Sequence, residues 1–267
     1  MLRGFYTAAS GMISQQRQQE AMANNIANMN TPGYKADQTS LRAFPEMLMQ
    51  KMGRTNLPTT ESLSLSNHTP VGSLNTGVYA QEMIPNFEQG DLKETGMPTD
   101  LALVSDQSPD ETGDVFFTVQ NEAGDIRYTR NGNFTVDGHG ALVTNQGYHV
   151  LDQAGNPIQT NGTSFNVQSD GMLEVDGQNI QLGIAYIENT HDLEKEGNDL
   201  FNGDATALPA DASYTVEQGA LENANVDSLQ TMTKMMQAYR MFETNQRVLK
   251  AYDESMGKAV NDIGRIG

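Results

Sequence analysis

The C-terminal end of the chain carries a seven-residue apolar repeat, which constrains its fold more than any other feature. Its members recur every seven residues: Met235, Phe242, Leu249, Met256 and Ile263. This spacing places them on one face of an α-helix, as in the seam of a coiled coil. An alternate seam is predicted from Met232, Tyr239 and Val260, with interruptions at Gln246 and Asp253. The repeat predicts one long helix over residues 226–263.

A second amphipathic helix is predicted at the N-terminus. Its stripe steps by three and four residues through Leu2, Phe5, Ala9, Met12, Gln16, Gln19, Ala23 and Ile26. An ordinary amphipathic helix packed on its own domain would explain either end alone. Because both seams include polar positions, pairing of one end with the other explains them better. We therefore expect a discontinuous α-helical coiled-coil domain, residues 1–34 and 221–267, with the rest of the chain inserted in it.

The middle of the chain is predicted to be an antiparallel β domain over residues 81–220. Turn signals follow at short intervals: Asn121–Asp125, Asn131-Gly132, Asp137-Gly138, Asn145–Gly147, Ala154–Asn156, Asp170-Gly171 and Asp176-Gly177. Short β-prone runs lie between them, and the alternation in IQLGIAY from Ile180 to Tyr186 indicates one half-buried strand. Residues 35–80 have weak periodicity and are expected to form a linker or irregular arm. The predicted fold class is α+β, with seven or more strands between the terminal helices.

Charge is distributed unevenly along the chain. The net charge is −18, and residues 36–220 carry 7 basic against 27 acidic residues. An acidic middle argues against nucleic-acid binding, which needs a basic surface. No apolar run reaches the length of a membrane-spanning helix, and polar residues interrupt the N-terminal stretch where a cleaved secretory signal would be continuous. We expect no direct membrane insertion, and either a cytoplasmic protein or one that leaves the cytoplasm by a route that cleaves nothing.

Residues that would indicate catalysis are absent or scattered. There is no cysteine, and the four histidines (His68, His139, His149, His191) lack metal-ligand spacing. Asp/Gly-rich segments such as SDGMLEVDG lack the spacing of a calcium loop and fit hairpin turns. We expect no catalytic residue, metal or cofactor. A secreted cell-wall glycosidase with paired carboxylates on the β domain is the alternative from another class.

The stretch NNIANMNTPGYKAD, residues 24–37, combines asparagines with a Pro-Gly pair directly after the first predicted helix. Asn24, Asn25 and Asn28 can hydrogen-bond the backbone or a neighbouring subunit around the helix end. Thr31-Pro32 stops the helix, and Gly33 permits the chain to turn.

This stretch resembles the N-terminal signature of the bacterial flagellar rod and hook proteins. LRGFYTAASGM before it and QGALENANVDSLQTMTKMMQAYRMFETNQRVLKAYDE near the C-terminus resemble the terminal segments of that family. TGMPTDLAL and IRYTRNGNFTVDGHGALVTNQGYHVL are similar to its rod branch, with the distal rod proteins most similar and proximal rod or hook-like subunits as alternatives. The resemblance implies a non-enzymatic subunit of a hollow helical filament, whose terminal helices pair in the inner core while the β domain faces outward.

The resemblance also implies which residues carry assembly and export. The expected assembly residues are Leu2, Phe5, Met12, Asn24, Asn25, Ile26, Asn28, Asn30, Pro32, Gly33, Tyr34, Met235, Tyr239, Phe242, Asn245, Leu249 and Met256. Family members leave the cell uncleaved through the flagellar type III apparatus, and Phe44 and Leu48 match a short element proposed to dock at its gate. The expected partners are other copies of the chain, other rod and hook proteins and this export apparatus, and the expected location is the flagellar basal body, outside the cytoplasm.

Overall fold

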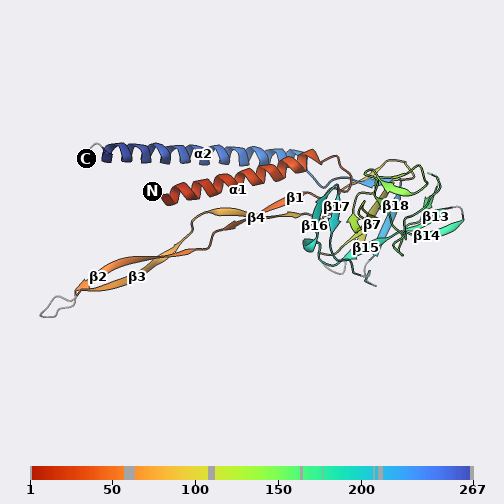
Figure 1. The fold of residues 1–267 in the computed structure, drawn as a ribbon, viewed down its shortest axis with the longest axis horizontal. Coiled ribbons are helices and arrows are strands. Elements are labelled where there is room, and N and C mark those ends of the chain that lie inside the picture. The colour runs from red at the N-terminus through yellow and green to blue at the C-terminus, as the bar shows by residue number, and fades with distance from the viewer. Residues whose placement is uncertain are drawn as a thin grey trace. The chain divides into compact units, whose positions relative to one another are not determined.

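A computed structural model describes residues 2–56, 64–107, 112–162, 165–175, 177–206, 208–209 and 213–264. Its elements are two long helices at the chain ends and a β-rich region between them (Figure 1). The α+β class predicted from the sequence is confirmed. In the described residues, no helix is long and apolar enough to cross a membrane.

The chain divides into two compact units. Unit 1 contains Met1–Ala23, Thr39–Met83 and Met232–Gly267, and unit 2 contains Asn24–Gln38 and Ile84–Thr231. The helix α1 (Leu2–Ala27) therefore has its last turn in unit 2, and α2 (Ser228–Gly264) begins there.

Helix α2 begins after Asp227, which caps it. The Oδ1 of Asp227 accepts a hydrogen bond from the backbone N of Gln230 at 3.0 Å, and its carbonyl accepts from the Thr231 hydroxyl at 2.6 Å. Such a cap satisfies amide groups that have no partner within the first helical turn.

Four strands that the sequence does not predict lie mostly in unit 1. β1 (Asp37–Ala43) pairs with β4 (Val78–Pro85), and β2 (Met47–Asn56) pairs with β3 (Ser64–Leu74) as a hairpin. These strands lie where the sequence suggested a linker or irregular arm over residues 35–80, of which residues 57–63 are outside the described part. The hairpin has no alternation of buried and exposed residues, since its described side chains are nearly all exposed, and the usual sequence signal of a strand is therefore missing.

The main sheet of unit 2 is antiparallel, in the order β16-β17-β8-β7-β11-β10-β9, with β15 also paired to β7. Its strands are β7 (Asp114–Gln120), β8 (Ile126–Thr129), β9 (Phe134–Val136), β10 (Leu142–Thr144), β11 (His149–Val150), β15 (Ile184–Ile187), β16 (Glu194–Gly197) and β17 (Leu200–Asn202). β7 is the central strand. Its first four side chains, from Asp114 to Phe117, are all buried.

Smaller antiparallel sheets complete unit 2. They comprise β12 (Asn166–Val167), β13 (Met172–Val175) and β14 (Gln178–Gln181), the pair of β6 (Leu101–Gln107) with β18 (Ser213–Gln218), and the pair of β5 (Leu92–Glu94) with β19 (Ala220–Glu222). The hydrophobic core includes Leu101, Phe117, Leu142, Val150 and Leu173, each fully buried. A short 3₁₀ helix, Thr190–Asp192, precedes β16.

Two local predictions in unit 2 were wrong. Ile180–Tyr186 is not one strand, because β14 ends at Gln181 and β15 begins at Ile184. Between them, a Cβ at Gly183 would lie 2.7 Å from the Leu151 carbonyl oxygen, so close backbone approach interrupts the strand. Asn131-Gly132 was expected to be a hairpin turn, but Gly132 is buried against the Leu101 carbonyl, where a Cβ would overlap it.

Candidate assembly interface

In unit 1, helices α1 and α2 contact each other through glycines of α1. Gly4 lies against the ring of Tyr252, and a Cβ at Gly11 would be 3.1 Å from the Nδ2 of Asn245. From the first of these contacts to the second, the residue number rises by seven in α1 and falls by seven in α2. The two helices therefore run antiparallel. A glycine at each contact removes the side chain that would otherwise hold the helices apart.

The main seam predicted on α2 is partly covered. The second covered line of α2 lies one residue N-terminal to the alternate seam that the sequence predicts. Met235, Phe242, Leu249 and Met256 are all partly buried. A second covered line contains Ala238, Asn245, Tyr252 and Ala259. The predicted alternate positions Met232, Tyr239 and Val260 are instead 48%, 54% and 70% exposed.

The displacement has a physical reason. The prediction followed apolar side chains, but the glycines of α1 accept Asn245 and Tyr252, a polar residue and an amphipathic one. The large apolar residues one position further along α2 therefore face away from this contact.

On α1, the side chains of Phe5, Met12 and Ile26 are partly buried. The side chain of Leu2 is not among those that the structure describes. The most buried positions are Ala8, Ser14, Ala21, Met22 and Asn25. Hydrogen bonds attach this helix to the segment that leads into β4: the Thr7 hydroxyl donates to the Thr76 carbonyl at 2.9 Å, and the Ser14 hydroxyl donates to the Val78 carbonyl at 3.1 Å.

An apolar pocket of about 340 Å³ lies on this helix pair, lined by Gln19, Met235, Met236, Tyr239 and Arg240. Two buried amide atoms of α1, Gln15 Oε1 and Gln19 Nε2, have no hydrogen-bond partner among the described residues. Buried polar atoms of this kind are uncommon in complete interfaces. The pocket leaves apolar side chains of the helix pair uncovered in the isolated chain.

The asparagine stretch forms two different contacts in unit 2. Asn28 Nδ2 donates to Asn24 Oδ1 at 2.8 Å and to the Asn24 carbonyl at 3.0 Å, which closes the exposed side of the helix end. Asn25 is buried; its Nδ2 donates to the Asp37 carbonyl, and its Oδ1 accepts from the Asp37 backbone N, both at 2.9 Å. Asn30 is exposed and Pro32 is partly buried.

Gly33 and Tyr34 follow in a tightly packed turn. Gly33 has φ +69°, and a Cβ there would be 2.5 Å from the carbonyl carbon of Arg130. Tyr34 is 5% exposed, its hydroxyl donates to Asn25 Oδ1 at 3.1 Å, and Lys195 Nζ lies 4.3 Å from its ring centroid. Burial, with the Asp37 carboxylate as second cause, raises the pKa of Tyr34.

Sequence reasoning missed the buried charges next to this turn. Lys35 Nζ lies 2.7 Å from Glu222 Oε1, and Arg130 Nη2 lies 2.7 Å from Asp114 Oδ1. Lys35 stands inside the quoted stretch, and Glu222 stands inside the C-terminal one. Nothing in their spacing predicts the contact, because 187 positions separate them.

The two export candidates lie near the turn between β1 and β2. The Phe44 side chain is 38% exposed, with its ring 5.2 Å from that of Tyr79, and Leu48 is 64% exposed. Both are therefore accessible on unit 1.

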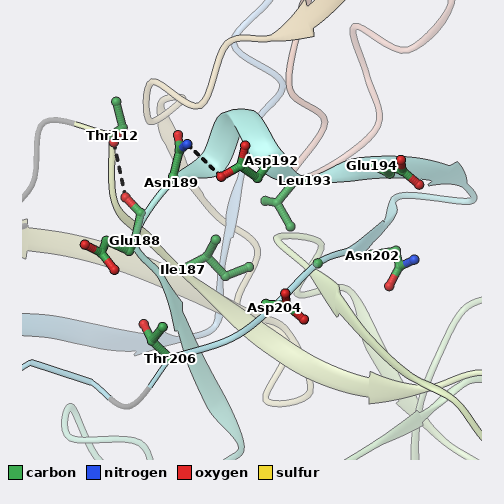
Figure 2. A pocket seen from close by; sticks show the side chains of 11 residues that line it. Thr112, Ile187, Glu188, Asn189, Asp192, Leu193, Glu194, Asn202, Asp204 and Thr206 are labelled. Atoms are coloured by element: carbon green, nitrogen blue, oxygen red, sulfur yellow. Dashed lines mark hydrogen bonds between the residues drawn. The ribbon is translucent and has the colours of Figure 1, made fainter.

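One pocket of unit 2 is acidic. Its volume is about 760 Å³, and the carboxylates of Glu188, Asp192, Glu194 and Asp204 line it (Figure 2). Asn189 Nδ2 donates to Asp192 Oδ2 at 2.7 Å, and the Thr112 hydroxyl donates to the Glu188 carbonyl at 3.1 Å. The described residues contain no group of His, Asp or Glu arranged to hold a metal ion. The pocket gives no specific support to the glycosidase alternative.

Three family models match separate parts of the chain. They are described as flagella basal body rod protein at residues 5–35, flagellar hook protein FlgE/F/G D1 domain at 112–175, and flagellar basal body rod FlgEFG protein C-terminal at 217–262. Among curated relatives, the flagellar hook-basal body complex protein FlhO of Bacillus subtilis is 42% identical, with 100% of both chains covered. The chain belongs to the flagellar rod and hook protein family.

Further members of the family match over nearly the full length. The flagellar basal-body rod protein FlgG of Borreliella burgdorferi is 32% identical over 98% of each chain. FlgG of Bacillus subtilis is 31% identical over 98% of this chain and 99% of its own. The family consists of structural proteins, so the chain is a structural protein of the flagellar basal body and not an enzyme.

Proposed function

We propose that the chain is a distal-rod-like subunit that polymerises through its terminal helices, transmits torque and supports hook assembly. The observation that carries the proposal is an exposed stripe on α2, formed by Met232, Met236 and Tyr239 at 48%, 57% and 54% exposure. Fully burying a side chain of this kind stabilises an interface by about 1.5–3 kcal/mol. The apolar pocket lies on the same helix pair and supports the same use.

The two helices would form a discontinuous coiled-coil domain, residues 1–34 and 221–267. The seven-residue steps from Gly4 to Gly11 and from Asn245 to Tyr252 support this arrangement. Residues 35–80 would be an arm and residues 81–220 the outward-facing β domain. Contacts between copies that do not close into a ring would extend this arrangement into an open helical filament.

Full-length similarity to basal-body rod proteins FlgG of several bacteria supports a place in the rod. Proximal rod and hook-like subunits are the alternatives, and the match to a hook-basal body complex protein favours neither of them. Other rod and hook proteins would be its neighbours in the basal body.

The assembly surface is tested with Met236→Asp and a matched Gln237→Asp. Both residues are exposed on the same helix, but only Met236 belongs to the stripe. Met236→Asp should leave the helix content of the monomer unchanged and remove the protein from purified hook-basal bodies, as measured by mass spectrometry. Gln237→Asp should incorporate normally. Normal incorporation of Met236→Asp would exclude the stripe from assembly.

Leu249→Asp tests the seam between the helices. It should abolish incorporation while the β strands of unit 2 keep their amide protection. A deletion strain should lack hooks and swimming, and a swimming deletion strain would contradict the rod assignment.

Export through the flagellar type III apparatus, without a cleaved signal, would bring the chain outside the cytoplasm. The exposure of Phe44 and Leu48 supports a docking role for this element. Phe44→Ala should block secretion at unchanged cytoplasmic level, whereas Met47→Ala, at an exposed neighbouring position, should not. Equal secretion of both variants would remove Phe44 from this role.

A further inference from the structure

Four charged side chains are buried together in unit 2. Lys35, Arg130, Glu222 and Asp114 are 1%, 2%, 2% and 7% exposed. They come from four segments: the turn after α1, the residue directly after β8, β19 and the start of β7. Two positive and two negative charges make the cluster electrically neutral.

Lys35 uses every donor of its ammonium group. Its Nζ donates to Glu222 Oε1 at 2.7 Å, to the Glu88 carbonyl at 3.0 Å and to the Phe87 carbonyl at 3.3 Å. Glu222 Oε1 also accepts from the Gly90 backbone N at 2.9 Å. Burial, followed by the charge of Arg130, lowers the pKa of Lys35, which shows that the cost of burying its charge is only partly offset.

Arg130 joins this pair to a second one. Its Nη2 donates to both carboxylate oxygens of Asp114 at 2.7 and 2.8 Å, and its Nη1 donates to the Leu103 carbonyl at 2.9 Å. Its Nε faces Glu222 Oε2 at 3.9 Å, and neither atom has a hydrogen-bond partner among the described residues. The carboxylate of Glu222 therefore lies between two cations.

Backbone hydrogen bonds reinforce the same junction. Gly33 N donates to the Glu222 carbonyl at 2.8 Å, and Ala36 N donates to Asn225 Oδ1 at 2.8 Å. Asn225 Nδ2 continues to the Asn86 carbonyl at 2.8 Å. Residues 33–36 and residues 222–225, which lie far apart in the sequence, therefore meet at one place in unit 2.

We propose that this cluster is a chain-end lock: the stability of all of unit 2 depends on the simultaneous presence of residues 33–37 and 219–225. A buried ion pair adds little over apolar residues of similar size, but removing one partner leaves an uncompensated buried charge. Without residues 33–37 the remaining three charges carry a net −1, and without residues 219–225 they carry a net +1. Either incomplete state places an unpaired charge against the core strands.

The lock has a consequence for the growing chain. Glu222 is the last of the four residues to be made, so unit 2 cannot reach full stability until all but the final 45 residues exist.

The experiment compares full-length variants by amide hydrogen exchange of β10 (Leu142–Thr144), a strand that contributes nothing to the cluster. Lys35→Met should speed the exchange of β10 by about a hundredfold or more, as breaking a buried pair predicts. Lys35→Met with Glu222→Met restores neutrality and should recover at least about tenfold of that loss. Glu196→Gln removes the exposed partner of Arg127 at 2.6 Å and should change exchange by less than about fivefold.

Two results would overturn the lock. One is faster exchange in Lys35→Met confined to residues 31–37 and 219–225, with β10 protected as in the wild type. The other is a double variant that exchanges as fast as Lys35→Met, which would make the cluster ordinary packing. If Lys35→Met does not fold, a folded double variant supports the lock and an unfolded one refutes it.

Discussion

Gly11 of α1 lies against the amide of Asn245 of α2, so closely that a Cβ at Gly11 would be 3.1 Å from Nδ2. The contact lies on the covered line of α2 that contains Ala238 and Tyr252. A larger side chain at Gly11 must therefore displace either Asn245 or the helix itself.

Gly11→Leu should weaken the helix pair. Overpacking of this kind costs about 1–3 kcal/mol, which should raise amide exchange in residues 8–16 and 241–249. The control is Gly257→Leu on α2, because a Cβ there would meet no heavy atom within 4 Å beyond its chain neighbours and nearby helix backbone, and the change gains the same helix propensity. Adding Asn245→Ala to Gly11→Leu should restore protection. Unchanged exchange in Gly11→Leu would mean that the two helices do not rely on this contact.

The two helices show which of their features the sequence predicts and which it does not. The repeat of Met235, Phe242 and Leu249 was enough to predict both the helix and one covered face, because apolar spacing follows the helical period directly. The second face was missed because its members were chosen by hydrophobicity. Its position is set by Gly4 and Gly11, small residues on another element that leave room for Tyr252 and Asn245.

Gly33→Ala should destabilise unit 2 far more than Gly96→Ala. Both glycines have φ near +70°, and an alanine in that conformation costs about 1–2 kcal/mol. Only at Gly33 would the new Cβ meet backbone, 2.5 Å from atoms of Arg130, whereas a Cβ at Gly96 would meet no heavy atom within 4 Å beyond its chain neighbours. Urea unfolding of both full-length variants measures the difference, which we expect to exceed about 2 kcal/mol. Equal losses would show that the turn at Gly33 can open without cost.

Buried charges limited the prediction of unit 2. Strand runs such as Val115–Val119 carry a signal in the sequence, because their burial requires mostly apolar residues. Lys35, Arg130 and Glu222 have no such signal, since charged residues are normally exposed and their pairing is decided by long-range packing. The β2–β3 hairpin was missed for the opposite reason, because neither of its faces is buried within the chain.

The stability of unit 2 should fall above pH 10 through Tyr34. Burial and Asp37 raise the pKa of Tyr34 above its ordinary value of 10.0, so the unfolded chain loses this proton first. The contribution is fully present below pH 10 and is lost as the pH rises towards the folded pKa, by up to about 1.4 kcal/mol per pH unit. Tyr34→Phe should remove this part of the pH dependence.

The measurement is the free energy of unfolding by urea between pH 8 and pH 11 for both proteins. The lowered pKa of Lys35 makes the free energy of unfolding rise with pH in the alkaline range, opposite to the effect of Tyr34. Lys35 is present in both proteins. The difference between the two slopes therefore isolates Tyr34. If the unfolding free energies of the two proteins differ by the same amount at every pH, the raised pKa of Tyr34 is contradicted. That constant difference then reports only the lost hydrogen bond to Asn25.

Asn25→Leu should separate the structural asparagine of the NNIANMNTPGYKAD stretch from the exposed one at Asn30. Asn25 is 6% exposed and exchanges two hydrogen bonds of 2.9 Å with the Asp37 backbone, while it accepts a third from the Tyr34 hydroxyl at 3.1 Å. Leucine has a similar volume but leaves those partners unsatisfied, at a total cost of about 3 kcal/mol.

Asn30→Leu should change the free energy of unfolding by less than about 0.5 kcal/mol, because Asn30 is exposed. If Asn30→Leu nevertheless reduces incorporation into hook-basal bodies, its role lies between subunits, whereas Asn25 acts within the chain. Equal unfolding free energies for the two variants would show that the hydrogen bonds of Asn25 do not hold the Tyr34 turn in place.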